Sequence, residues 1–148
     1  MSYVDSPDRD SPDPDSPDRD AADTVLVVDA ANVVGSVPDG WWRDRRGATE
    51  RLRDRLAPLA TTGLPGLSAP LRVVLVCEGR ARGVTSIVPV SIVDAPGSGD
   101  DTIVDVVTRY RFRHVVVVTA DRELRRRVKD LGADTLGPSA LPPTITAN

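Results

Sequence analysis

Several residue types on which common chemistries depend are scarce in this 148-residue chain. Its one cysteine, Cys77, cannot form a disulfide within the chain, and its one histidine, His114, makes a histidine-based zinc site or catalytic triad unexpected. Only one of the 19 basic residues is a lysine, Lys129. There is no apolar run of about 18 residues and no secretory signal pattern. These absences favour a cytoplasmic protein with no membrane partner.

The net charge of −3 conceals an uneven distribution. Residues 1–23 contain eight Asp against two Arg, whereas the remaining residues contain 17 Lys and Arg against 14 Asp and Glu. Residues 5–20 repeat an Asp-Ser-Pro-Asp pattern without apolar side chains to bury, which predicts a disordered acidic leader. The leader either solubilises the chain or competes with nucleic acid for a basic face. The mildly basic remainder permits a nucleic-acid partner.

Apolar runs alternate with helical patterns along the rest of the chain. Continuous apolar runs at residues 24–29, 71–77 and 115–119 predict buried parallel strands, and residues 84–93 predict a further strand that is shortened or bent at Pro89. Helices are expected from Ala48 or Thr49, after the N-cap Ser98, and after Asp121 up to Gly132. We therefore predict an α/β three-layer sandwich around a mostly parallel sheet over residues 24–137, with a flexible tail at 138–148.

Acidic residues are expected at the carboxyl ends of these strands, where ligands bind in open α/β sheets. Asp29 ends the first strand, where an unpaired buried acid would be costly, and Asp121 follows the 115–119 strand. Asp100 and Asp101 begin a helix, with Asp105 one turn further on the face of Asp101. Clustered carboxylates need a compensating charge, and Mg²⁺ or Mn²⁺ provides it through oxygen ligands. Taken singly, each of these acids except Asp29 is better explained as a helix cap or a solvated loop residue, whereas the set as a whole favours a metal site.

Other acid-bearing α/β folds fit the sequence less well. A phosphatase of the haloacid-dehalogenase type needs a second acid where Ala31 stands, and it shares with response-regulator receivers the need for a lysine at a later strand end. Lys129 lies within the last predicted helix instead. The glycine-rich motifs of P-loop and dinucleotide-binding proteins are absent from the chain. Cys77 is expected to be a buried strand residue rather than a nucleophile.

Three motifs together resemble the NYN domain family, a branch of the PIN-like nuclease superfamily. They are V-V-D-A-A-N-V-V-G-S (Val27–Ser36), G-S-G-D-D-T-I-V-D (Gly97–Asp105) and V-V-T-A-D-R-E-L (Val117–Leu124), and they occur in the family's order. The resemblance implies a PIN-like, Rossmann-like fold and Mg²⁺- or Mn²⁺-dependent cleavage of RNA phosphodiester bonds. It implies a catalytic set of Asp29, Asn32, Asp101 and Asp121, and a metal-binding set of Asp29, Asp100, Asp101, Asp105 and Asp121.

In the same resemblance, Asn32 would orient water or a phosphate. Asp105 departs from the family pattern because it is shorter than the Glu often found at that position.

Aromatic and basic residues outside the motifs are candidate RNA contacts, because aromatic rings stack on bases and arginines bind phosphates. Alternatively, one tryptophan fills the core and the arginines are solvated. Glu78 would line the edge of the site. The candidate RNA-binding residues are Trp41, Trp42, Arg43, Arg45, Arg80 and Arg82.

Two other functions remain open at this stage: a non-catalytic RNA-binding or interaction module of the same fold and, less favoured, a nucleotide-binding or phosphatase module. The expected partner is single-stranded RNA, and the sequence leaves open a homodimer or a larger RNA-processing assembly.

Overall fold

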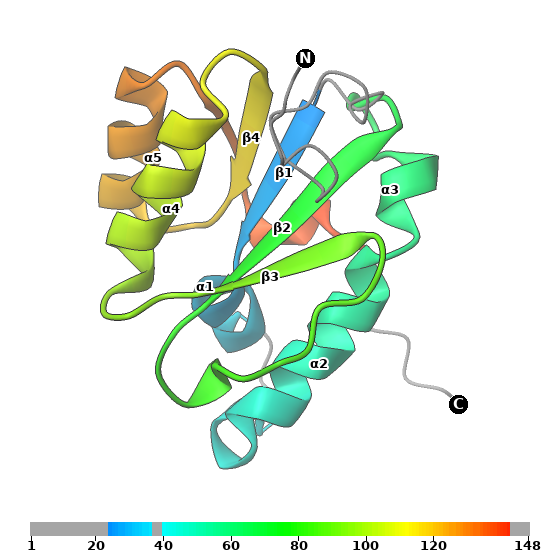
Figure 1. Cartoon of the computed structure of the whole chain (residues 1–148), viewed down its shortest axis with the longest axis vertical. Coiled ribbons are helices and arrows are strands. Elements are labelled where there is room, and N and C mark those ends of the chain that lie inside the picture. Colours follow the sequence, from blue (N-terminus) through cyan, green and yellow to red (C-terminus); the bar gives the residue numbers. More distant parts are fainter. Residues whose placement is uncertain (1–23, 37–39, 143–148) are drawn as a thin grey trace, which may run out of the picture.

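The computed structural model describes residues 24–36 and 40–142, which build one five-stranded parallel sheet (Figure 1). The strand order is β3-β2-β1-β4-β5, with every neighbouring pair parallel. From β1 the chain adds β2 and β3 on one side and β4 and β5 on the other. The strands are β1 (Thr24–Asp29), β2 (Leu71–Cys77), β3 (Val90–Asp94), β4 (His114–Val118) and β5 (Asp134–Leu136).

Helices cover both faces of the sheet, so the chain forms the predicted three-layer α/β sandwich (Figure 1). One layer contains α1 (Ala30–Gly35), α2 (Arg45–Leu56) and α3 (Leu59–Thr62), and the other contains α4 (Gly99–Arg109) and α5 (Arg122–Asp130). Three short 3₁₀ turns complete the described elements: η2 (Trp41–Arg43), η3 (Gly79–Ala81) and η4 (Pro138–Ala140). Each helix in residues 24–36 and 40–142 falls short of the length and apolar character needed to cross a bilayer.

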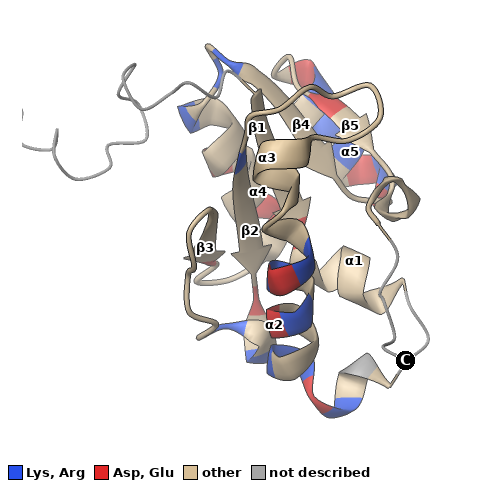
Figure 2. Ribbon diagram, turned by 90° about the vertical axis from the view of Figure 1, so that its right-hand side faces the viewer, with Lys and Arg blue, Asp and Glu red and all other residues tan. Residues whose placement is uncertain are grey.

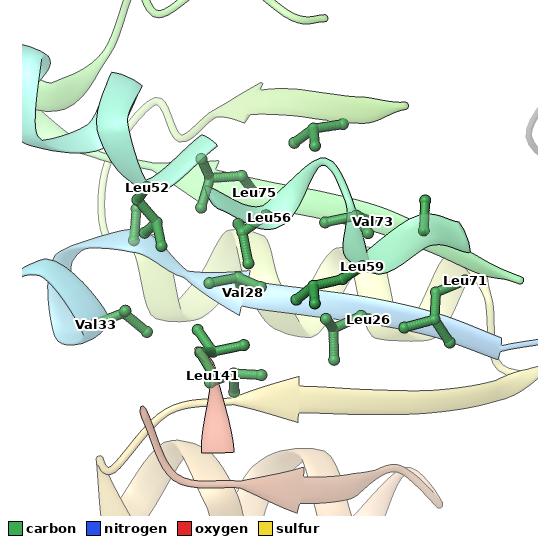
Figure 3. Close-up of a cluster of buried hydrophobic side chains, with 14 of the residues drawn as sticks. Leu26, Val28, Val33, Leu52, Leu56, Leu59, Leu71, Val73, Leu75 and Leu141 are labelled. Carbon is green, nitrogen blue, oxygen red and sulfur yellow. The ribbon is translucent and has the colours of Figure 1, made fainter. Parts of the chain in front are cut away.

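The apolar runs form two cores because successive strand side chains point to opposite faces of the sheet. Leu26 and Val28 of β1 belong to the core under α1–α3, and Val25 and Val27 belong to the core under α4 and α5. Figure 3 shows the first core, in which leucines of α2 and α3 pack over β1 and β2. Burial on both faces explains why these strands are continuously apolar in sequence.

Local signals set the helix ends as the sequence indicated. The Ser98 hydroxyl caps α4 by accepting a hydrogen bond from the backbone N–H of Asp100 at 3.1 Å. Gly132 follows α5 with a φ of +93°, and the N–H of Ala133 bonds back to the carbonyl of Val128. Helix α2 begins earlier than predicted, at Arg45, because the carboxylate of Asp44 caps it.

Several expected boundaries differ from those observed. The strand predicted over residues 84–93 is confined to β3, because the chain turns at Ile87–Val90 and Pro89 has no N–H to donate. The flexible tail predicted from residue 138 instead begins with η4, and Leu141 is buried in the first core. Helix α1 and strand β5 were not predicted. The leader, residues 1–23, and the end of the tail, residues 143–148, lie outside the described residues.

Candidate active site

The site lies between the carboxyl ends of β1 and β4, where the chain leaves the sheet in opposite directions. Ligands bind at such switch points because the loops after the two strands diverge and open a crevice. Here the β1–α1 junction supplies Asp29 and Asn32, and the β4–α5 junction supplies Thr119 and Asp121. The fold therefore brings together the first and third sequence motifs.

Hydrogen bonds link these two junctions directly. The Thr119 hydroxyl donates to Oδ2 of Asp29 at 3.0 Å and accepts from the backbone N–H of Asp121 at 3.1 Å. The side-chain Oδ1 of Asn32 accepts from the backbone N–H of Ala120 at 2.8 Å. The other carboxylate oxygen of Asp29 accepts from the N–H of Asn32 at 3.4 Å. Thr119 is fully buried and holds Asp29 in place, a role that the sequence did not reveal.

Glu78 connects the second motif to the same edge of the sheet. It directly follows β2, and its Oε1 accepts a hydrogen bond of 2.6 Å from the backbone N–H of Gly99, the first residue of α4. The positive end of a helix favours a carboxylate at this position. A side chain on Gly99 would collide with that Glu78 oxygen, so glycine permits the close approach.

Asp100 interacts electrostatically with Asp29, Glu78 and Asp121, and these four acids are called here the acidic cluster. Burial, followed by the negative charges of Asp100 and Glu78, raises the pKa of Asp29 to about 6, although its hydrogen bonds from Thr119 and Asn32 oppose the rise. Burial also raises the pKa of Asp100, assisted mainly by Asp121 and Glu78. Raised carboxyl pKa values at a sheet crevice are typical of a functional site.

The two remaining predicted acids of α4 lie on its exposed surface. The Asp101 carboxylate is largely exposed. It accepts a hydrogen bond of 3.1 Å from the guanidinium of Arg127 of α5, with which it forms an ion pair. Asp105 is exposed one turn later. The structure thus brings together Asp29, Asn32 and Asp121, and it adds Asp100 rather than Asp101 to the acidic cluster.

The predicted RNA-contacting residues lie on the α1–α2 side. Trp42 is 54% exposed and therefore does not fill the core, and the guanidinium of Arg43 lies 5.5 Å from its ring centroid. Arg45 and Glu78 both line a pocket of about 210 Å³. Arg80 is exposed, and Arg82 donates to the carbonyl of Gly79 at 3.2 Å. Basic and acidic positions both occur along α2 (Figure 2), and the Trp41 side chain is outside the described part.

Cys77 ends β2 and is fully buried in the core under α1–α3. Burial, assisted by the negative charge of Asp94, raises the pKa of its thiol to about 12. The thiol therefore stays protonated at neutral pH, which confirms a packing role over a nucleophilic one.

The donor chemistry of the crevice fits a hard divalent cation. All four side chains of the acidic cluster offer carboxylate oxygens, and their mutual repulsion is relieved by a positive ion. Within residues 24–36 and 40–142, no three His, Cys, Asp or Glu side chains are placed close enough to hold an ion by themselves. Mg²⁺ commonly keeps several waters and uses only one or two carboxylates, so this arrangement suits Mg²⁺ better than a fully enclosed metal.

Comparison with known proteins gives a likeness of fold. The structure resembles that of a tryptophan-to-leucine mutant of Rae1 (YacP) from Bacillus subtilis, with a TM-score of 0.64 and 18% sequence identity. The match covers 79% of this chain and 71% of that chain. No protein-family model and no curated protein sequence matches the chain. At this identity the likeness shows a shared fold.

Replacing Gly99 with alanine tests the contact between Glu78 and α4. We expect Gly99→Ala to displace the Glu78 carboxylate and to lower divalent-cation affinity by about tenfold, the usual effect of disturbing a group that supports a metal site. Stability should change little, because the displaced atom ends a flexible side chain. Mn²⁺ binding followed by calorimetry measures the effect.

Gly97→Ala is the matched control, because no atom lies within 4 Å of a Cβ added there. Equal Mn²⁺ affinities for the two glycine variants would contradict the assigned role of Glu78.

Proposed function

We propose that this chain is a metal-dependent endoribonuclease that hydrolyses single-stranded RNA at the acidic cluster. The observation that carries the proposal is the convergence of Asp29, Glu78, Asp100 and Asp121 from four chain segments at the switch point of the sheet. Burial raises the pKa values of Asp29 and Asp100, so keeping these two acids ionised in the folded chain is costly, and a function is the simplest reason for them.

A divalent ion, Mg²⁺ or Mn²⁺, would be held by one or two of the carboxylates of Asp29, Asp100 and Asp121, with water as its other ligands and Glu78 at the edge of the site. When bound, such an ion activates water and neutralises charge that develops on a phosphodiester. Thr119 fixes the rotamer of the Asp29 side chain through its hydroxyl. The side-chain oxygen Oδ1 of Asn32 accepts a hydrogen bond from the backbone N–H of Ala120. The side-chain NH₂ group of Asn32 is therefore the part of its amide that would bind a phosphate oxygen.

Three further lines of support agree with the proposal. The three sequence motifs resemble those of the NYN family and occur in the same order, and the first and third are hydrogen-bonded to each other across the crevice. The fold also resembles that of Rae1 (YacP) from Bacillus subtilis. The mildly basic composition of residues 24–148 suits an RNA substrate.

The proposal is tested by cleavage of a 5′-labelled single-stranded RNA with two neighbouring variants. Asp100→Asn should lower the cleavage rate in Mg²⁺ by at least about tenfold, because it removes a charge that faces the other acids. The matched variant Asp101→Asn should stay within about twofold, because that exposed carboxylate only pairs with Arg127. If the wild-type chain leaves RNA intact in Mg²⁺ and in Mn²⁺, the proposed function is wrong.

A further inference from the structure

A segment of alternating arginine and aromatic residues lies at the end of the sheet opposite the acidic cluster. Residues 109–114 read R-Y-R-F-R-H and join the end of α4 to the start of β4 (Figure 1). Phe112 is 88% exposed, although phenylalanine is usually buried. The guanidinium of Arg111 lies 4.7 Å from the Phe112 ring centroid and also donates to the carbonyl of Thr108 at 3.1 Å. The exposed ring is therefore accompanied by an arginine held in place.

A pocket lies beside the first two residues of this segment. A pocket of about 230 Å³ between β3 and α4 is lined by Arg72, Arg109 and Tyr110, together with Ser91 and Val93. The guanidinium of Arg72 lies 5.8 Å from the Tyr110 ring centroid. Two arginines therefore line a pocket close in sequence to Phe112, while the Tyr110 ring itself is buried. Arg72, Arg109, Arg111 and Phe112 are called here the arginine–phenylalanine surface.

We propose that the arginine–phenylalanine surface binds single-stranded RNA, as a second contact for the strand that reaches the acidic cluster. This inference rests on the proposed function. Bases of any sequence stack on exposed aromatic rings, and arginines add phosphate and cation–π contacts, which is how proteins bind single strands without reading their sequence. Neither the catalytic proposal nor the fold requires an exposed Phe112.

Helix α4 connects the two sites, because Asp100 lies in its first turn and Arg109 is its last residue. Eleven helical residues span roughly 16 Å, and a stacked strand advances about 3.4 Å per nucleotide, so about five nucleotides separate the two contacts. RNA long enough to reach both sites should therefore lose affinity when Phe112 is removed.

The acidic leader is the competing occupant of this surface. Residues 1–23 carry eight Asp against two Arg and join β1 at Thr24, whose register partner across the sheet is His114. Thr24, the first described residue, therefore lies at the same end of the sheet as the arginine–phenylalanine surface. RNA fits better because the leader provides charge but, apart from Tyr3, no aromatic ring to stack on Phe112.

The test measures RNA binding by the full-length chain carrying Asp29→Asn, in chelator, with a fluorescent 12-nucleotide RNA and several salt concentrations. Phe112→Ala should raise Kd about tenfold without changing the salt slope, because stacking is lost but no charge. Arg111→Gln should reduce the slope of log Kd against log salt by about 0.7, the value for one phosphate contact. The controls Val88→Ala and Arg51→Gln, both at exposed positions, should stay within about twofold of the parent.

Unchanged binding by both Phe112→Ala and Arg111→Gln would overturn the inference. Tighter RNA binding by Arg111→Gln would also overturn it and would assign the surface to the leader. Because binding is measured without cleavage, the two proposals fail separately. A wild-type chain that never cleaves RNA, yet loses binding through Phe112→Ala, contradicts the proposed function and supports the second contact.

Discussion

Asp29→Asn should abolish cleavage of single-stranded RNA and at the same time stabilise the metal-free protein at pH 7. Cleavage is lost because Asp29 is the buried acid at the centre of the proposed metal site, held by the Thr119 hydroxyl. Stability rises because burial and two neighbouring acids raise the pKa of Asp29 to about 6, so keeping it ionised at neutral pH is unfavourable. A neutral amide of the same shape removes that cost, and we expect a gain of roughly 2 kcal/mol in the free energy of unfolding.

The measurements are a cleavage assay in Mg²⁺ and urea unfolding in chelator. Asp54→Asn is the matched control, since Asp54 is an exposed acid of α2 that pairs with the adjacent Arg53. That control should leave both cleavage and stability near wild type. An Asp29→Asn protein that is folded and still cleaves RNA at the wild-type rate would overturn the assignment of the site.

The stability of the metal-free chain should fall as pH rises through the pKa of Asp29. The model-compound pKa of an aspartate is 3.8 and the folded value is about 6, so the folded chain binds the proton more tightly than the unfolded chain does. The resulting stabilisation is complete below the lower value and is lost as pH passes the upper value. We expect roughly 2 kcal/mol to be lost between pH 4 and pH 7.5 from this group alone, and the raised pKa of Asp100 acts in the same direction.

Other groups titrate over the same range, so the informative quantity is the difference in the free energy of unfolding between wild type and Asp29→Asn at each pH. Glu123, for example, has its pKa lowered by its hydrogen bond to Arg126, and its effect on stability has the opposite sign. Urea unfolding of both proteins at pH 4, 5, 6 and 7.5 in chelator isolates the contribution of Asp29. A difference that does not vary with pH would mean that the folded pKa of Asp29 is not raised.

The parts of the fold that rest on local patterns could be predicted from the sequence. The apolar runs ending at Asp29 and Cys77 predicted β1 and β2 at their observed bounds. Ser98 predicted the start of α4, and Gly132 predicted the end of α5. These signals depend on neighbouring residues alone. Helix α1, with six residues, and strand β5, with three, are too short to produce a periodic pattern.

The parts of the site that rest on long-range contacts could not be predicted. Glu78 was expected at the edge of the site, but its hydrogen bond to Gly99, 21 residues away, was not, and neither was the bond from Thr119 to Asp29 across 90 residues. The choice between Asp100 and Asp101 depends on the rotation of α4 about its axis, which the position of Arg127 on α5 reveals. The burial of Leu141 could not be predicted either, because a single buried residue after a short turn produces no periodic pattern in the sequence.

Restoring a divalent ion to the chelated full-length chain tests the central claim most directly. The purified protein is treated with chelator, mixed with a 5′-labelled single-stranded RNA, and titrated with Mn²⁺ while the internal cleavage products are followed. The account predicts no cleavage in chelator, a saturable return of internal cuts with added Mn²⁺, and no return for Asp29→Asn. Equal cleavage with and without the ion, or intact RNA at every Mn²⁺ concentration, would contradict it.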